Sequence, residues 1–386
     1  MLISGRTNTI LLVLILAVGV ALVAMLASGA HGGPLDPPGP TASTSGVLRP
    51  GTPITSLPFD ITQPGNYYLT GNLTLAATGT GITIDSSNVT LDLGGFTIDG
   101  TNTGGSGVFI PSQFQGTNLR EITVRNGTAQ DWTQDGFDME FVDGLIAENL
   151  QADNDGTGIV VANARLSDCT ANFNANGGVQ SKGGSTITGC TTKNNQGAGF
   201  ILVNGSVLES CTAVGNSAAG IDVRASTVDG CATYGNLYGI AVGFNCNVRN
   251  NTVSQSSSDG IRVASPSGSG ESVITENTVE SAGSNSSASG IYVQTQNNLI
   301  SRNHVTSTNG PGIQVVGSFN TIDENSTLSN TGIGIVVGGS KNTVVHNNSL
   351  GNVNQSSSTN YSIGTGNNPG PIDPASASTN PWSNTQ

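Results

Sequence analysis

The sequence predicts an all-β protein, a right-handed parallel β-helix of about twelve coils, and three observations support this prediction. A phrase of the form Gly-apolar-x-apolar returns about every 20 residues, as in GIVV at Gly158 and GIDV at Gly220. A second phrase, apolar-x-x-Cys or apolar-x-x-Asn, follows in step, as from Leu166 to Cys169. The composition, with 54 Gly and only 10% charged residues, favours short strands joined by tight turns. Each strand is therefore expected to pair with its counterpart one coil away, at about 4.8 Å.

Residues 1–30 are predicted to be a signal peptide or an N-terminal anchor. Arg6 precedes an apolar run from Ile10 to Ala27, and small residues ending at Ala30 would serve as a cleavage site. The run is about 18 residues long, at the lower edge of what spans a bilayer, so a retained anchor is the alternative. Residues 31–52 are rich in Gly, Pro, Ser and Thr and are predicted to be a flexible linker. The rest of the chain is expected outside the cytoplasm, extracellular or at the cell surface, with a membrane contact only through such an anchor.

The β-helix, with an N-terminal cap, is predicted to occupy residues 53–366, followed by a C-terminal tail at 367–386. Three longer steps between copies of the Gly phrase indicate loops inserted into a coil. These loops are expected at about residues 99–106, at 111–118 or 127–134, and at 264–288. The copies of the phrase begin at Gly81, Gly107, Gly136, Gly158, Gly178, Gly199, Gly220, Gly239, Gly260, Gly290, Gly312 and Gly334.

The two phrases together resemble the parallel β-helix repeat of the pectin-lyase-like superfamily. Three stretches resemble a group of secreted, largely uncharacterised bacterial β-helix proteins. They are the opening stretch from Thr52 to Thr74, VTLDLGGFTI from Val89 to Ile98, and the closing stretch from Asn367 to Trp382. The resemblance covers about residue 52 to the end. It implies the fold and leaves the activity open, because the superfamily holds lyases, hydrolases, epimerases, adhesins and non-catalytic scaffolds.

Four cysteines, Cys169, Cys190, Cys211 and Cys231, replace Asn at one corner of successive coils. They are expected to form an inward stack with sulfurs about 5 Å apart and to serve in packing. A disulfide between neighbours and a metal site are the alternatives, although ligands in a line do not converge on one ion. Cys246 lies outside this register and is expected to be a lone buried thiol.

Asparagines at the corners of the coils are expected to hydrogen-bond buried amides, and they form two sets. The first set ends the second phrase, which in the coil before the cysteines is assigned to Ile146–Asn149. A column four residues before the Gly is assigned to Asn154, Asn174, Asn195, Asn216 and Asn330.

Asp138 and Glu140 are the candidate catalytic residues. In the GFDME phrase, Phe137 and Met139 should point inward, which turns both carboxylates outward on one face. Carboxyl groups one pleat repeat apart stand at about 6.5 to 7 Å, a separation compatible with acid/base chemistry on a glycosidic bond. The alternatives are a solvated acidic face and a Ca²⁺ site.

Calcium is the one cofactor considered, because eight acidic residues occur between Arg125 and Arg165 with no Lys or Arg among them. No other metal or cofactor is predicted. The residues expected near Ca²⁺ are Asp138, Glu140, Asp153 and Asp155.

Asp222, Arg224, Arg262 and Tyr292 are the candidate substrate-binding residues. The phrase places them on the same outward face, with roughly two coils between successive members. Arg and Tyr beside Asp can grip a sugar by hydrogen bonds and ring stacking, whereas exposed salt bridges between columns are the alternative. The insert from Ala264 to Ala288 is expected to wall one side of this groove.

A net charge of -13 disfavours nucleic acid as a partner. A polyanionic polysaccharide would need a local basic patch or bridging cations, whereas neutral glycans meet no such barrier. The sequence lacks the GHG motif of pectin-degrading hydrolases and the DPHE motif of mannuronan epimerases. These absences disfavour an enzyme but do not exclude a hydrolase, because two carboxylates suffice for that chemistry. We predict an extracellular protein that binds polysaccharide or cell-surface glycan along its strand groove; whether it also cleaves the glycan, as a hydrolase or lyase, is left open, and a non-catalytic structural or adhesion rod is the alternative. The oligomeric state is left open.

Overall fold

The computed structural model describes residues 51–112, 119–265, 270–284, 287–354, 357–358, 360–374 and 380–386. The predicted signal peptide or anchor lies outside these residues, as does nearly all of the predicted linker. Within the described ranges every regular element is a β-strand, and no helix there is long and apolar enough to cross a membrane.

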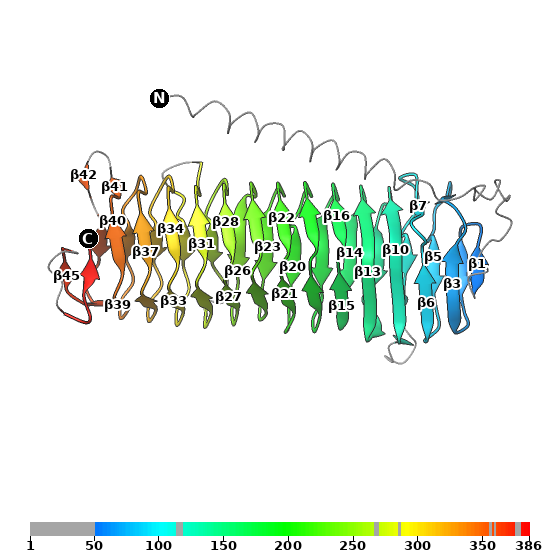
Figure 1. Cartoon of the computed structure of the whole chain (residues 1–386), viewed down its shortest axis with the longest axis horizontal. Coiled ribbons are helices and arrows are strands. Elements are labelled where there is room, and N and C mark those ends of the chain that lie inside the picture. Colours follow the sequence, from blue (N-terminus) through cyan, green and yellow to red (C-terminus); the bar gives the residue numbers. More distant parts are fainter. Residues whose placement is uncertain are drawn as a thin grey trace, which may run out of the picture. The chain divides into compact units, whose positions relative to one another are not determined.

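Each coil of the β-helix passes through three strand rows. One coil consists of β14 (Thr157–Val161), β15 (Ala164–Ser167) and β16 (Thr170–Asn172). Each of these strands pairs in parallel with its counterpart in the next coil. Figure 1 shows the coils stacked along one axis in the order of the sequence. The predicted fold class, a right-handed parallel β-helix, is confirmed.

The first row, which we call the groove sheet, contains 14 strands within the described residues. The twelve Gly phrases form β5 to β38, and β2 and β43 extend the row at its two ends. The groove sheet runs in the order β2 (Phe59–Ile61), β5 (Ile82–Ile84), β8 (Val108–Phe109), β11 (Asp135–Met139), β14, β17 (Gly177–Ser181), β20 (Phe200–Leu202), β23 (Ala219–Val223), β26 (Tyr238–Val242), β29 (Ile261–Val263), β32 (Ile291–Val293), β35 (Ile313–Val315), β38 (Ile335–Val337) and β43 (Tyr361–Ile363).

The second and third rows join in one 28-stranded sheet within the described residues, because β10 and β13 continue around the corner and belong to both. The second row holds β1 (Thr52–Ile54), β3 (Gly65–Leu69), β6 (Val89–Asp92), β10 (Ile122–Gln130), β13 (Leu145–Asp153), β15, β18 (Thr186–Thr188), β21 (Val207–Glu209), β24 (Thr227–Asp229), β27 (Asn247–Arg249), β30 (Val273–Thr275), β33 (Leu299–Ser301), β36 (Thr321–Asp323), β39 (Thr343–Val345) and β44 (Asn368–Pro369). The third row holds β4 (Leu73–Thr74), β7 (Thr97–Asp99), β10, β13, β16, β19 (Thr191–Lys193), β22 (Thr212–Val214), β25 (Ala232–Tyr234), β28 (Thr252–Ser254), β31 (Thr278–Glu280), β34 (His304–Thr306), β37 (Ser326–Leu328), β40 (Asn348–Leu350) and β46 (Asn384–Thr385). Outside the rows lie the pairs β9 (Leu119–Arg120) with β12 (Val142–Asp143) and β41 (Val353–Asn354) with β42 (Ser357–Ser358), and β45 (Ile372–Asp373) beside β46. Strands β44 and β46 thus bring parts of residues 367–386 into the two rows.

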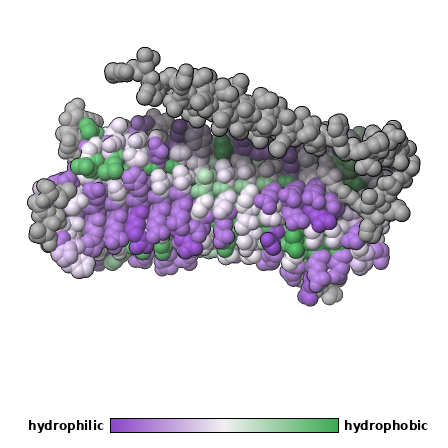
Figure 2. Space-filling view, viewed as in Figure 1, coloured by the Kyte–Doolittle hydropathy of each residue, from purple (hydrophilic) through white to green (hydrophobic). Residues whose placement is uncertain are grey.

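The core is a continuous stack of inward side chains from all three rows. Strands of three residues bury two side chains and turn one outward in the groove sheet, as in β20, where Phe200 and Leu202 are buried and Ile201 lies between them. The face seen in Figure 2 is largely hydrophilic, with hydrophobic residues only in scattered patches. Burial of apolar stacks is therefore the main force that holds the coils together.

The expected inserts are only partly as predicted. For the insert expected at 111–118 or 127–134, residues 127–130 belong to β10 and are no loop, whereas residues 113–118 lie outside the described residues. Residues 264–288 are no single insert either, because they contain β30 and β31 of an ordinary coil. Residues 266–269 and 285–286 of this expected insert lie outside the described residues.

A buried ladder of asparagines occupies the corner before the groove sheet. The amide Nδ2 of Asn174 donates to Oδ1 of Asn195 at 2.9 Å, and Asn195 repeats this bond to Asn216. The residue that meets Asn174 at the N-terminal end is Asp155, whose backbone N–H donates to Asn174 Oδ1, so the assignment of Asn154 to this column is wrong. Asn154 instead adopts φ 58°, at the turn just before the ladder position.

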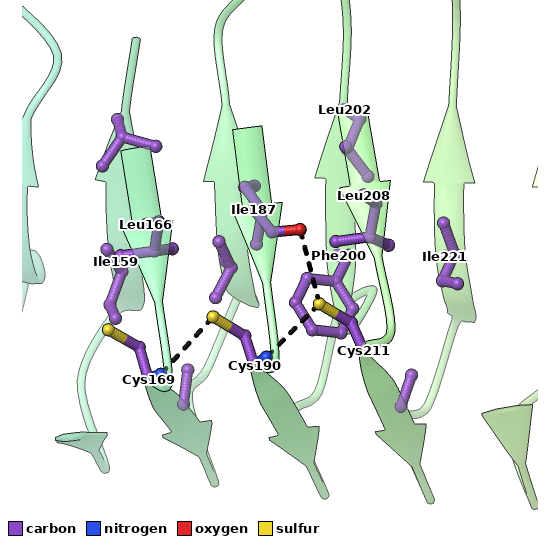
Figure 3. Packing of buried hydrophobic residues seen from close by; sticks show 14 of the residues in the cluster. Ile159, Leu166, Cys169, Ile187, Cys190, Phe200, Leu202, Leu208, Cys211 and Ile221 are labelled. Carbon is purple, nitrogen blue, oxygen red and sulfur yellow. Dashed lines mark hydrogen bonds between the residues drawn. The ribbon is translucent and has the colours of Figure 1, made fainter. Parts of the chain in front are cut away.

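The cysteine ladder fills the equivalent corner between the second and third rows (Figure 3). Cys169 N–H donates to Cys190 Sγ at 3.4 Å, and Cys190 N–H donates to Cys211 Sγ at 3.3 Å. All five cysteines are buried and free, which confirms the packing prediction for the stack. At the N-terminal end Leu150, and not the predicted Asn149, holds the ladder position, since its N–H donates to Cys169 Sγ.

Cys246 belongs to a third corner column. Its N–H donates to Ser272 Oγ at 3.1 Å, so it stands in register with a column of serines. The thiol is buried, as predicted, and burial raises its pKa. It lies apart from the four-membered stack.

Candidate functional site

An acidic cluster stands on the outer face of the groove sheet at β11. Phe137 and Met139 are fully buried, while Asp138 and Glu140 are half-buried, so the predicted alternation of this strand is confirmed. Asp138 is in register with Phe109 of β8 on one side and Val160 of β14 on the other. Two apolar neighbours therefore flank the carboxyl group along the axis of the β-helix.

Burial raises the pKa of Asp138 to about 6, and the negative charges of Asp135 and Glu140 add to this increase. Lys182 acts in the opposite direction. Asp138 Oδ1 is buried and has no hydrogen-bond partner. Burial also raises the pKa of Asp135. A carboxyl group that titrates near neutral pH beside a second carboxyl is suited to donate a proton in catalysis.

The four carboxyl groups expected near Ca²⁺ do not gather at one place. Asp155 points into the interior, where its Oδ1 accepts the backbone N–H of Trp132 at 2.9 Å. Asp153 lies in the third row and accepts from Asn172 Nδ2 at 3.0 Å. In the described part of the chain, no three His, Cys, Asp or Glu side chains are arranged to hold a metal ion.

A pocket of about 270 Å³ opens on the same face, between β23 and β29. This size is close to the lower end of small-molecule sites, about 300 Å³. Asp222, Arg224 and Arg262 line it, so three of the four predicted binding residues come together. Burial raises the pKa of Asp222, while Arg224, whose Nη2 lies 3.0 Å from Asp222 Oδ2, acts in the opposite direction. Tyr238 and Phe244 supply aromatic rings to the lining.

Arg262 is held firmly in this pocket. Its Nη1 donates to Asp259 Oδ2 at 3.0 Å, and its guanidinium lies 5.4 Å from the ring centre of Tyr238 and 5.0 Å from that of Tyr292. Asp259 is itself fixed, since its Oδ1 accepts the N–H of Ser289 at 2.7 Å. Tyr292 thus acts on Arg262 from the next coil and does not line the pocket.

The register corrects the predicted spacing. Asp222 pairs with Ala241 and Ala241 with Arg262, which is two coils, but Tyr292 pairs directly with Arg262. The steps between successive members are therefore unequal. The longer step in sequence from Gly260 to Gly290 adds no extra coil, because β29 pairs directly with β32.

The sequence prediction missed the two aromatic residues that line the pocket, Tyr238 and Phe244, and also Asp259, which holds Arg262 from behind the lining. Tyr238 and Asp259 each stand immediately before the Gly of a phrase, and Phe244 lies in the turn after one. Only positions inside the phrase had been assigned a direction. The sequence did carry a signal for these residues. It was an aromatic or acidic residue next to the Gly of a phrase, on a coil that also carries an outward charge.

The acidic cluster and the pocket share one column of the groove sheet. The successive partners in register along this column are Asp138, Val160, Gln180, Ile201 and Asp222. Four coils separate Asp138 from Asp222, or about 19 Å at a strand spacing of about 4.8 Å. An extended polymer laid along the axis would contact both.

Two family profiles match the chain. The family described as "Right handed beta helix region" matches residues 61–216, and the family described as "Periplasmic copper-binding protein (NosD)" matches residues 214–373. No curated protein sequence matches the chain significantly.

Among solved structures, the A-module of mannuronan C-5 epimerase AlgE6 from Azotobacter vinelandii is similar, with 16% identity, coverage of 76% of this chain and 88% of that module, and a TM-score of 0.55. The A-module of AlgE4 from the same organism has 15% identity, coverage of 71% and 84%, and a TM-score of 0.48. The tailspike protein of E. coli bacteriophage HK620 has 14% identity, coverage of 74% and 64%, and a TM-score of 0.44. At these identities the likeness extends to the parallel β-helix fold alone.

Proposed function

We propose that this chain, a right-handed parallel β-helix protein of the pectin-lyase-like superfamily, binds a polysaccharide or cell-surface glycan along its groove sheet and cleaves it with Asp138 and Glu140. One observation carries the proposal. Asp138 is an outward carboxyl group with a near-neutral pKa, an unpaired oxygen and a second carboxyl group nearby. Asp222, Arg224 and Arg262 would bind the same glycan farther along the column, with Tyr292 supporting Arg262.

In the proposed hydrolysis, protonated Asp138 donates its proton to the glycosidic oxygen as the bond to the anomeric carbon breaks. Glu140 accepts a proton from the water that attacks this carbon. One water is consumed, and two carboxyl groups suffice for the chemistry. Phe109 and Val160, the neighbours in register, would exclude water from the two sides of the acid that face along the axis of the β-helix.

We place the described β-helix outside the cytoplasm. The periplasmic description of the family matched by residues 214–373 supports this placement, as does the apolar N-terminal run of the sequence. The name of the epimerase with a TM-score of 0.55 refers to a polysaccharide, mannuronan, which agrees with a glycan partner at the level of the fold.

Copper, which the description of that family names, does not fit the residues present. Cys231 and Cys246 are buried in different corner columns, and His346 Nδ1 is 2.7 Å from Asp323 Oδ1. The donors available among the described residues do not converge. No step proposed here involves copper.

The test is product analysis with a panel of neutral and acidic polysaccharides, by reducing-end assay and mass spectrometry. Asp138→Asn and Glu140→Gln should each lower kcat by about 100-fold or more, the range for loss of a general acid or base. Asp60→Asn is the matched control, because Asp60 is an exposed carboxyl on the same sheet three coils away. Absence of product, together with absence of retention on every glycan, would refute the proposal.

A non-catalytic rod for adhesion or display is the second candidate. The side-chain ladders favour it, because Asn251, Asn277, Asn303 and Asn325 continue the cysteine column without a break and stabilise a long regular scaffold. Such a rod would bind glycan without releasing product. Binding that survives Asp138→Asn, with no product from the wild type, would favour the rod.

A further inference from the structure

We infer that the pocket between β23 and β29 accepts an uncharged sugar and discriminates against a uronate at the same position. The inference rests on the proposed function, since it names the class of glycan that the groove sheet would bind. It is carried by the pairing of charges in the pocket and by the charges along the face that leads to it.

Both arginines of the pocket are already paired with carboxylates of the chain itself. Arg224 pairs with Asp222 at 3.0 Å, and Arg262 pairs with Asp259 at 3.0 Å. The Asp259 side chain is only 5% exposed and also accepts a backbone N–H, so it is not free to move away. An incoming carboxylate would have to displace Asp222 or share an arginine with a buried anion. Like charges placed together in this way cost several kcal/mol and exclude the wrong partner.

A sugar hydroxyl meets no such penalty. It both donates and accepts hydrogen bonds, so it can bind an arginine N–H and the neighbouring aspartate oxygen at once. Phe244, 38% exposed, and Tyr238 add aromatic surface beside these pairs. Paired charges and ring faces together favour a polar ring without net charge.

The approach to the pocket is also unfavourable for a polyanion. A polymer that reaches from the pocket to Asp138 would lie over the cluster of Asp135, Asp138 and Glu140, with Lys182 as the cation that acts on this cluster. The chain as a whole carries a net charge of -13. Repulsion of this kind lowers both the association rate and the affinity for polyanions at low salt.

The experiment uses matched oligosaccharides that differ only at carbon 6. One pair is β-1,4-mannohexaose and β-1,4-mannuronohexaose, and the other is α-1,4-galactohexaose and α-1,4-galacturonohexaose. Binding to the full chain is measured by calorimetry at low and high salt. We expect the neutral member of at least one pair to bind about tenfold or more tightly than its acidic partner, a difference of about 1.4 kcal/mol or more. Salt should leave the neutral affinity unchanged and strengthen binding of the acid.

Two variants locate the effect in the pocket. Asp222→Asn removes one carboxylate and frees Arg224. It should therefore lower the ratio of the affinity for the neutral oligosaccharide to the affinity for its acidic partner. Asp229→Asn is the matched control, because Asp229 forms a similar exposed ion pair with Arg249 in the second row, and it should change nothing. Tighter binding of the acidic member at low salt, or a preference unchanged in Asp222→Asn, overturns the inference and leaves the proposed function standing. Failure of both pairs and of the polysaccharide panel to bind overturns the proposed function and this inference with it.

Discussion

The buried carboxyl group of Asp155 leads to the most quantitative prediction. Asp155 is 2% exposed and stands where the asparagine ladder would place another amide. Its Oδ1 accepts the N–H of Trp132, while Oδ2 is buried without a partner. Protonation avoids burying a charge at this oxygen, and burial raises the pKa of Asp155 from 3.8 to about 9. Asp155→Asn should therefore supply the missing amide and remove a titrating group from the core.

The expected gain depends on pH. Below about pH 4 the carboxyl is protonated in both the folded and unfolded states and its titration has no effect on stability. Above this pH the unfolded chain releases the proton and the folded chain retains it, so stability is lost as pH rises toward the folded pKa of about 9. At about 1.4 kcal/mol per pH unit, the loss reaches about 4 kcal/mol at pH 7.

Guanidinium unfolding of the wild type and of Asp155→Asn at pH 4, 7 and 8.5 measures this effect. The difference in free energy of unfolding should grow with pH by about 1.4 kcal/mol per unit. Asp153→Asn, at the surface end of β13, should change the free energy by less than about 0.5 kcal/mol at each pH. Asn195→Asp should introduce a similar pH-dependent loss. A difference between wild type and Asp155→Asn that does not vary with pH would show that Asp155 is ionised in the folded protein, and would refute the reasoning.

Three further predictions follow from the ladders and the cluster. Activity that depends on protonated Asp138 should fall as the pH rises above about 6, and Asp138→Asn should lose this alkaline limb of the pH–rate profile of kcat/KM. Cys190→Ala should lower the free energy of unfolding in guanidinium by about 1–3 kcal/mol, because it leaves the buried N–H of Cys169 without an acceptor. Cys190→Ser should lower it by less, and equal losses in the two variants would contradict the role of the thiol as an acceptor. Gly136→Ala should lower the thermal midpoint, because a Cβ there would collide with the Asp155 side chain, whereas Gly71→Ala, with nothing within 4 Å, should not; equal midpoints would show that the corner can relax.

The outward column of the groove sheet could be predicted because its alternation is strict. Once Ile221 and Val223 are taken as inward, Asp222 must face out, and the fixed Gly carries this register from coil to coil. The same logic places Asp138 and Arg262 on one face.

The corner residues could be predicted only to within one position. Asn is favoured both at a turn with positive φ and at a buried amide ladder, and these two positions are adjacent. Asn149, with φ 53°, and Asn154, with φ 58°, occupy the turn positions, and the ladder begins one residue later. Sequence spacing alone does not separate the two uses.

The pocket could be predicted only in part because its geometry depends on contacts between coils. Asp259 and Tyr238 lie just before the Gly of their phrases, where no period fixes the side-chain direction. Their role appears only when Arg262 is seen between two tyrosine rings. The near-neutral pKa of Asp138 likewise depends on burial between Phe109 and Val160, which the sequence does not reveal.

A crystal structure of the protein with bound oligosaccharide tests the central claim most directly. The account predicts sugar rings along the outer face of the groove sheet, in the column from Asp138 to Arg262, with a hydroxyl or glycosidic oxygen within hydrogen-bond distance of Asp138. Sugar bound only to the second or third row, while the groove sheet stays free of it, would contradict the claim.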